Sequence, residues 1–224
     1  MRFYRVKISS WTSSFRYPNV ISGYQPTLEV PPISTVLGLI NACAGSYIEH
    51  EDIKIGYYFE YEKRATDLET IYQIETDDKN VPKNKAKSNV LRREFLYGCN
   101  LYLYLTDPAI VDHLRYPYYS VLLGRSNDLA TIESIEEVEL PEIENACKIR
   151  GQVIPFNNNY LPGTLQALPL YFTDTIPRRN IGTEPFSVIS CNSPDYPSHL
   201  TAYRDVINEQ EQDIYIHHLH LKNG

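Results

Sequence analysis

One stretch near the N-terminus constrains the fold of this 224-residue chain more than any other. Pro31 and Pro32 close an extended segment, and residues 34–44 then place apolar side chains at helical spacing. Ser34 is positioned to cap the first turn of this helix, and Gly45 stands where a left-handed C-terminal cap belongs. The stretch therefore predicts a short helix that is bounded at both ends and packs one face on a core.

The same helix has two features that a plain core helix does not need. Gly38 lies in its middle, where glycine costs about 0.5–1 kcal/mol relative to alanine, so we expect another backbone to approach closely there. The free N–H groups and partial positive charge of the first turn, at Ser34 and Thr35, suit a phosphate. A capped core helix without a ligand is the alternative interpretation.

The order of elements in the first part of the chain indicates the fold class. The patterns predict strand, helix, strand, strand, helix and strand, at residues 2–8, 34–44, 53–61, 100–106, 107–114 and 134–140. That is the order of a ferredoxin-like fold. We therefore predict an α+β protein in which residues 1–145 form a ferredoxin-like, RNA-recognition-motif-like domain.

The last part of the chain has a different character. Residues 146–224 are strand-prone and interrupted by prolines, which predicts a smaller β-rich region packed on the first domain. The four cysteines are far apart and match no metal-site spacing, so reduced thiols in a cytoplasm are expected. We expect no signal peptide or membrane span, because the most apolar run, residues 36–45, is too short.

Charge is distributed unevenly along the chain. The formal net charge of −7 argues against a free-standing nucleic-acid binder, which is usually basic, but it permits a local basic site. All charged residues between positions 79 and 93 are lysines or arginines. Residues 75–91 are predicted to form a polar, flexible excursion, for which a solvated loop without a ligand is the alternative interpretation.

Three stretches, taken together, resemble the fifth CRISPR-associated (Cas) family, the subunit of type I Cascade complexes that holds the 5′ handle of the guide RNA. The first combines Phe15-Arg16, Gln25-Pro26-Thr27 and the Pro-Pro-x-Ser-Thr-x-x-Gly-Leu run before the helix. The second is Arg92-Arg93-Glu94-Phe95-Leu96, and the third is residues 122–130, which contain Gly124-Arg125-Ser126. Their order and spacing are most similar to the type I-B branch.

The resemblance implies a function. A member of this branch is a non-catalytic Cascade subunit that binds the guide RNA (crRNA) 5′ handle, caps the backbone filament and contacts the large subunit in antiviral defence. Target DNA lies nearby, and no cofactor, metal or membrane is involved. The implied RNA-binding residues are Arg16, Ser34, Thr35, Arg92, Arg93, Gly124, Arg125 and Ser126. The resemblance also implies RNA binding by Lys83, Lys85 and Lys87. This assignment rests on position, because these lysines fall where the family has a thumb-like hairpin.

The chemistry of the Gly-Arg-Ser turn agrees with such a role. Arg125 is able to hold a phosphate through two parallel N–H bonds, and Gly124 lets the protein backbone come close to that phosphate. An ordinary turn is the alternative interpretation of this tripeptide. Arg92 and Arg93 are neighbours on a predicted strand, so their side chains should point to opposite faces. Only one of the two is therefore expected to reach RNA readily.

Two other function classes stay open. One branch of the same family is a metal-independent endoribonuclease that cuts the precursor repeat with tyrosine, lysine and histidine. This chain has Tyr47 after the first helix but no neighbouring lysine and histidine, so we expect no enzyme. A free RNA-recognition module is the third option. His218 and His220 share a strand face, where metal binding is an alternative to plain strand pairing.

Overall fold

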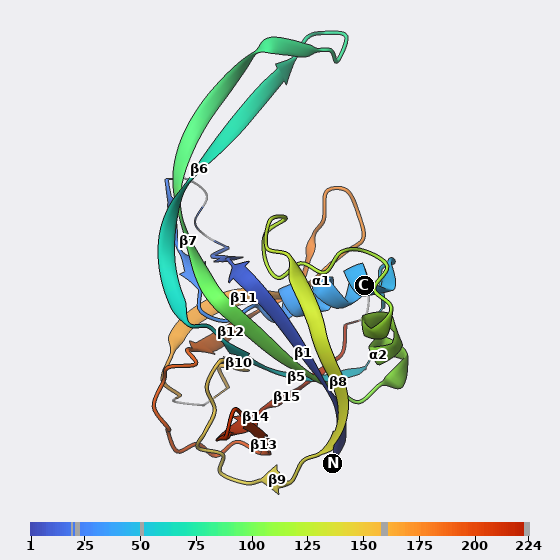
Figure 1. Ribbon diagram of the computed structural model, residues 1–224, viewed down its shortest axis with the longest axis vertical. Coiled ribbons are helices and arrows are strands. Elements are labelled where there is room, and N and C mark those ends of the chain that lie inside the picture. Colours follow the sequence, from blue (N-terminus) through green and yellow to red (C-terminus); the bar gives the residue numbers. More distant parts are fainter. Residues whose placement is uncertain (19, 21–22, 50–51, 158–160, 222–224) are drawn as a thin grey trace.

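A large sheet forms the centre of the computed structural model, which describes residues 1–18, 20, 23–49, 52–157 and 161–221 (Figure 1). Five strands of this sheet follow one another in space: β15 (Ile216–Leu219), β5 (Ile53–Glu60), β7 (Pro82–Leu105), β1 (Arg2–Ser13) and β8 (Ala130–Glu139). Two more, β3 (Tyr24–Gln25) and β6 (Lys63–Thr76), also pair with β7. Only the β3–β7 pairing is parallel among the described strands.

Two short helices, α1 (Ile33–Ala44) and α2 (Pro108–Arg115), join the main core. Alternate residues of the central strands, such as Val6, Ile8 and Leu103, contribute to the same fully buried cluster. Asp107 caps α2 by accepting a hydrogen bond from the amide of Ala109 (2.8 Å), as its position before Pro108 predicts. None of the helices in the described part of the chain is long and apolar enough to cross a membrane.

The expected caps of α1 are half correct. Gly45 ends the helix in the left-handed conformation, with φ of 72°, as predicted. A Cβ at this position would lie 2.4 Å from the ring of Tyr118, which is a second reason for glycine. The predicted cap at Ser34 is wrong, because the helix begins at Ile33 and its N-cap residue is Pro32, which has no side-chain donor or acceptor.

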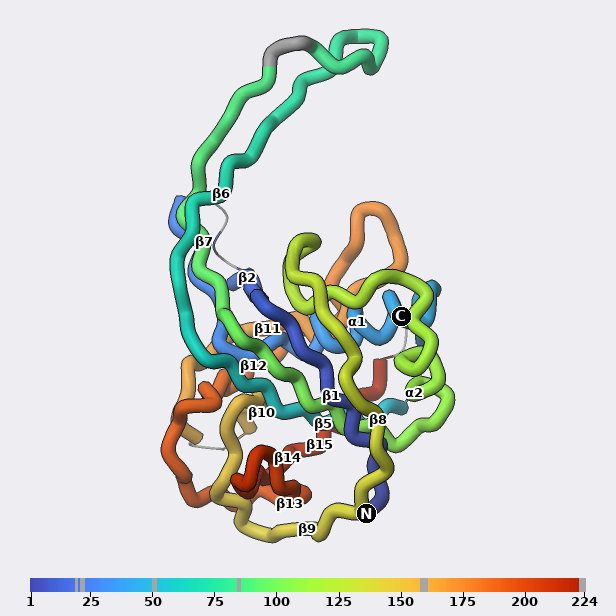
Figure 2. The backbone as a smooth tube through the Cα atoms, viewed as in Figure 1, coloured from blue at the N-terminus to red at the C-terminus, as the bar shows by residue number. Residues whose placement is uncertain are grey.

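The polar excursion expected at residues 75–91 is part of a long β-hairpin. β6 pairs with β7 over most of its 14 residues, and Figure 2 shows this hairpin projecting from the body of the molecule. Asp77 makes the turn at its tip by accepting hydrogen bonds from the amides of Lys79 (2.8 Å) and Val81 (2.9 Å). Asn80 adopts the left-handed conformation there, with φ of 59°. We call residues 63–97 the hairpin arm.

The prediction of an α+β, ferredoxin-like fold is wrong. The described residues are mostly strand, with two helices of 12 and 8 residues. Besides the large sheet, one smaller antiparallel sheet contains β10 (Gln152–Pro155), β12 (Asn180–Ile189) and β11 (Thr164–Phe172). Another contains β14 (Gln210–Ile214), β13 (Ala202–Ile207) and β9 (Glu142–Ile143). A third pairs β2 (Phe15–Arg16) with β4 (Thr27–Leu28). The reason is that polar stretches without clear periodicity become strands once a partner strand satisfies their backbone groups.

The end of the chain returns to the large sheet. β15 pairs with β5, and Asp205 of β13 accepts hydrogen bonds from Arg5 (2.9 Å) and from the Tyr104 hydroxyl (2.7 Å). His217 is buried in β15, and burial lowers its pKa to about 3, so it stays neutral. A division into domains at residues 145 and 146 stays a prediction.

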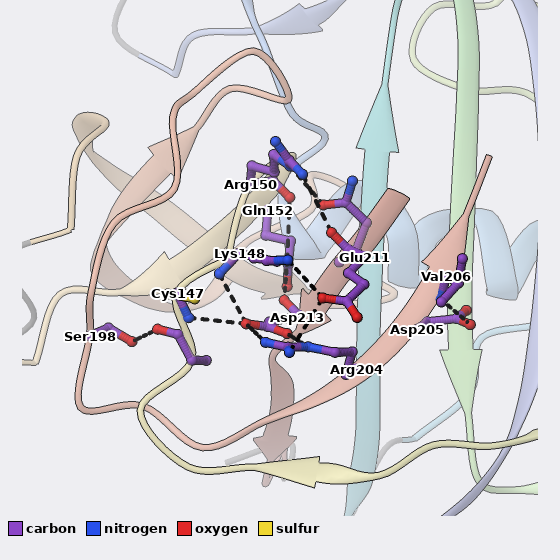
Figure 3. A network of polar contacts seen from close by, with 12 residues as sticks. Cys147, Lys148, Arg150, Gln152, Ser198, Arg204, Asp205, Val206, Glu211 and Asp213 are labelled. Atoms are coloured by element: carbon purple, nitrogen blue, oxygen red, sulfur yellow. Dashed lines mark hydrogen bonds and ion pairs between the residues drawn. The ribbon is translucent and has the colours of Figure 1, made fainter. Parts of the chain in front are cut away.

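One buried carboxylate organises the C-terminal strands. Asp213 is fully buried and accepts hydrogen bonds from Arg204 Nε (2.7 Å) and from the amides of Cys147 (3.0 Å) and Lys148 (2.9 Å), as Figure 3 shows. Burial alone would raise the pKa of Asp213, but these hydrogen bonds hold it below the ordinary value. The network therefore ties β13 and β14 to the segment before β10.

Asp213→Asn should lower the free energy of unfolding by about 2 kcal/mol at neutral pH, because it removes charge-assisted hydrogen bonds. A depressed pKa stabilises the fold above the unfolded value of about 3.9, and this contribution is lost as pH falls below it. The difference between wild type and variant should therefore shrink below about pH 4. Urea unfolding between pH 3 and pH 7 measures it, and a difference that does not change with pH would contradict the assignment.

Candidate functional site

Most of the predicted RNA-binding residues meet in one cleft. Its volume is about 490 Å³, and it lies where the end of β1, β2, the start of α1, the base of the hairpin arm and residues 124–127 come together. The predicted residues that line it are Arg16, Ser34, Thr35, Arg93, Gly124, Arg125 and Ser126. Pro32, Leu168 and Phe172 add apolar surface. Segments that lie far apart in the sequence therefore form a single site.

Asp128, a residue to which the sequence analysis gave no role, holds the Gly-Arg-Ser turn in place. Its side chain is fully buried and accepts hydrogen bonds from the Arg125 amide (2.9 Å), Arg125 Nε (3.0 Å), Arg125 Nη2 (2.9 Å) and the Thr12 hydroxyl (2.8 Å). An aspartate three residues after an arginine in a short turn was the available signal, since this spacing suits a local ion pair. The turn is thus anchored to the end of β1.

The ion pair with Asp128 limits how Arg125 is able to bind a phosphate. The two N–H groups expected to hold a phosphate in parallel, on Nε and Nη2, are already bound to Asp128. The hydrogen bond with Asp128 raises the pKa of Arg125, and its side chain is 23% exposed. Its Nη1 group makes no hydrogen bond to a described residue, so this is the part of the guanidinium left for a ligand.

Gly124 is required by packing within the protein. It has φ of 119°, and a Cβ there would lie 2.7 Å from the carbonyl oxygen of Ser14. Only glycine allows this turn to lie directly on the backbone that follows β1. The structure therefore explains Gly124 by contact with Ser14, while the expected close approach of the Gly124 backbone to an RNA phosphate stays a prediction.

The two arginines at the base of the hairpin arm point to opposite faces, as alternation predicts. Arg93 is buried against the cleft and its Nε donates to Glu69, which also lines the cleft. Arg92 is exposed on the other face. Arg93 is therefore the one of the pair that belongs to the cleft, and part of its charge is balanced by a carboxylate.

Arg16 is the cation that is most available in the cleft. It lies in β2, is exposed, and makes no ion pair with any described residue. The half-buried side chains of Ser34 and Thr35, in the first turn of α1, line the same cleft. The cleft is therefore lined by an arginine without a described ion-pair partner and by two hydroxyl groups.

A second groove, of about 530 Å³, continues from the cleft along α1. Ser34 and Phe172 line both hollows, and the groove then passes Gly38 and Asn41 toward Tyr47. The expectation that another backbone packs on Gly38 is wrong, because a Cβ at this position would meet no atom of the described residues within 4 Å. Packing in the described part of the chain thus gives no reason for a glycine here.

Of the three lysines of the hairpin arm that were predicted to bind RNA, the two with described side chains, Lys83 and Lys87, do not line the cleft. Lys83 is exposed, and Lys87 is paired with Glu75 (2.5 Å) on the neighbouring strand. The side chain of Lys85 lies outside the described residues. Their role in RNA binding stays a prediction. No group of three potential metal ligands occurs in the described part of the chain.

Comparisons with known proteins identify solved structures of similar fold. A chain of a "CRISPR RNA-guided surveillance complex" aligns with a TM-score of 0.58 and 17% identity, covering 87% of this chain and 91% of that one. A chain of "Type III-B Cmr-beta bound to cognate target RNA and AMPPnP" aligns with a TM-score of 0.54 and 13% identity, covering 87% and 86%. Neither a protein-family model nor a curated protein matches the sequence. At these identities the likeness shows a shared fold.

Arg125→Ala should lower the free energy of unfolding by about 1.5–3 kcal/mol, because it leaves the buried Asp128 carboxylate short of two charge-assisted hydrogen bonds. Arg115→Ala is a matched control, since Arg115 forms an ion pair with Asp112 at the same spacing but both side chains are largely exposed. The control should cost less than about 0.5 kcal/mol. Equal losses in urea unfolding would contradict an organising role for Asp128.

Proposed function

We propose that this chain is a non-catalytic subunit of a type I-B CRISPR Cascade complex and binds the 5′ handle of the guide RNA in the cleft. The observation that carries the proposal is the convergence of residues from separate segments on one hollow. Arg16, Ser34 and Arg93 come from three different elements, and all were selected from the sequence alone.

The shape and chemistry of the cleft suit a single strand of RNA. Arg16 supplies an unpaired positive charge, Ser34 and Thr35 supply hydroxyl donors, and Arg125 presents Nη1. The groove along α1 extends the path toward the half-buried ring of Tyr47, which is backed by the buried ring of Tyr171 at a centroid distance of 5.2 Å. Cations at one end and an aromatic side chain further on are what backbone tracking and base stacking require.

The similar solved structures support the setting. One belongs to an RNA-guided surveillance complex and the other to a Cmr assembly bound to cognate target RNA. In such a setting the partners of this chain are the Cascade backbone subunit and the large subunit, with target DNA nearby, in the cytoplasm. The net charge of −7 fits a subunit that binds RNA at a local site and depends on neighbours for the rest.

Arg16→Ala should weaken binding of single-stranded RNA that carries the handle sequence by about tenfold, because a charge-assisted phosphate contact is lost. The slope of log affinity against log salt should flatten by roughly 0.7, the value for one phosphate contact on a single strand. Arg2→Ala is the matched control, since Arg2 is exposed at the opposite end of β1 from the cleft. Fluorescence anisotropy at several salt concentrations measures both quantities.

Two results would count against the proposal. An affinity and salt slope that Arg16→Ala and Arg2→Ala change equally would show that binding is not centred on the cleft. A site-specific cut in repeat RNA, incubated with the chain alone and without metal, would replace the non-catalytic role with an endoribonuclease. RNA bound intact, with the cleft variant weaker than the control, is the expected outcome.

Gly38→Ala should separate stability from binding. Stability should rise by about 0.5–1 kcal/mol, because alanine is the better helix former and its Cβ meets open space. RNA affinity should fall, because the new methyl group projects into the groove along α1. Ala42→Gly, on the same face of the helix, is the reciprocal control and should destabilise without adding bulk. Unchanged RNA affinity in Gly38→Ala would remove this groove from the RNA path.

A further inference from the structure

The loop between β11 and β12, residues 173–179, contributes to one wall of the groove along α1. Figure 2 shows this loop, in orange, next to α1. The end of β11 is fixed there by the buried Tyr171, whose hydroxyl accepts a hydrogen bond from Asn41 Nδ2 (2.6 Å) and donates one to the carbonyl oxygen of Ile48 (2.9 Å). The loop is therefore held at a defined place beside the groove.

Hydrogen bonds within the loop brace its backbone. The amide of Thr173 donates to the carbonyl oxygen of Arg179 (2.8 Å), and the amide of Arg179 donates to Thr173 Oγ1 (3.0 Å). Thr175 Oγ1 donates to the carbonyl oxygen of Pro177 (3.0 Å). A braced loop loses less entropy when its side chains bind a ligand, so it is suited to present a binding group.

Arg178 and Arg179 are exposed neighbours on this loop, but they line different hollows. Arg178 lines the groove along α1. Arg179 lines an adjoining hollow of about 650 Å³, which does not include α1. Neither side chain makes an ion pair or a hydrogen bond with a described residue. One side of the loop therefore offers an arginine to the groove, and the other side offers one elsewhere.

Two unpaired arginines stand along one continuous path. Of the arginines that line the cleft or the groove, only Arg16 and Arg178 make no ion pair with a described residue. Arg16 lies in the cleft and Arg178 in the groove. Ser34 and the exposed Phe172 line both hollows, so the hollows share a wall. A ligand long enough to enter both would meet a cation in each and an aromatic ring where they join.

The chemistry of this path fits a single-stranded nucleic acid. Such a strand repeats a phosphate and a base along its length, which matches a cation, an aromatic ring and a second cation. Arg178 is the single cation among the described residues that line the groove, and the carboxylate of Asp174 lines it too. Because Asp174 repels a phosphate, the groove attracts one only at Arg178.

We propose that Arg178 is a second phosphate-binding residue for the guide RNA. The strand whose phosphate meets Arg16 in the cleft passes Phe172 and places another phosphate on Arg178 in the groove. This inference rests on the proposed function, because it concerns the same strand. It assigns a binding role to the β11–β12 loop, whereas the resemblance to a known family implied no RNA contact after Ser126.

Neighbouring variants on one loop test the proposal with single-stranded RNA that carries the handle sequence. Arg178→Ala should weaken binding about tenfold and flatten the slope of log affinity against log salt by roughly 0.7, the value for one phosphate contact. Arg179→Ala is the matched control and should stay within about twofold of wild type, because solvent and salt screen a charge that makes no contact. Arg178→Lys should keep the salt slope of wild type, since the positive charge remains.

A double variant tests whether one strand meets both arginines. Arg16→Ala combined with Arg178→Ala should weaken binding by the product of the single losses, about a hundredfold, because the two contacts lie in different hollows. Analytical ultracentrifugation should find one strand per chain in the wild type. Two strands per chain would overturn the inference.

The same set of variants distinguishes this inference from the proposed function. Equal affinities for Arg178→Ala and Arg179→Ala, with Arg16→Ala weakened, would overturn the inference and leave the proposed function standing. A weakened Arg178→Ala, with Arg16→Ala equal to its control Arg2→Ala, would contradict binding in the cleft and leave RNA binding by Arg178 standing. A wild type that binds no handle RNA would contradict both.

Discussion

One strand, β7, gives the molecule its shape. Its 24 residues run from the hairpin arm into the centre of the large sheet, where β1 and β5 pair with its two edges. On the arm side of Leu96 the partner β1 has ended, so β6 pairs with one edge of β7 and the short β3 pairs with the other edge only at Arg92 and Arg93. The place where β1 leaves β7 is where the cleft opens, between the base of the arm and the Gly-Arg-Ser turn. The same strand therefore supports the core, the cleft wall and the projecting arm.

Buried or half-buried carboxylates set the charge of the cleft. Asp128 and Glu69 are bound to Arg125 and Arg93, so neither arginine is a free cation, while Arg16 forms no ion pair with a described residue. Paired arginines are held in fixed orientations, which lowers the entropy lost when a ligand binds. The cleft thus combines two arginines in fixed orientations, Arg93 and Arg125, with one arginine, Arg16, that has no described ion-pair partner. Such an arrangement suits the orientation of a strand more than non-specific attraction of RNA by a high positive charge.

Local features were predictable from the sequence, and long-range pairings were not. The helix ending at Gly45, the cap at Asp107 and the opposite faces of Arg92 and Arg93 each follow from neighbouring residues. The C-terminal residues were expected to be strand-prone, but the fold class was missed because the arm is polar and becomes a long β-hairpin only by pairing. The ion pair of Asp128 with Arg125 had a local signal in the spacing of the two residues, but its hydrogen bond with Thr12, more than a hundred residues away in sequence, had none. The resemblance to a known family identified candidate site residues, but only the structure separates those that line the cleft from those that do not.

Amide hydrogen exchange with and without handle-bearing single-stranded RNA tests the central claim most directly. The account predicts that RNA slows exchange in residues 14–18, in the first turn of α1 and in residues 124–129, which together surround the cleft. The far end of β1, around Arg2, should be unaffected. Protection confined to the tip of the hairpin arm or to the C-terminal strands, with none around the cleft, would contradict it.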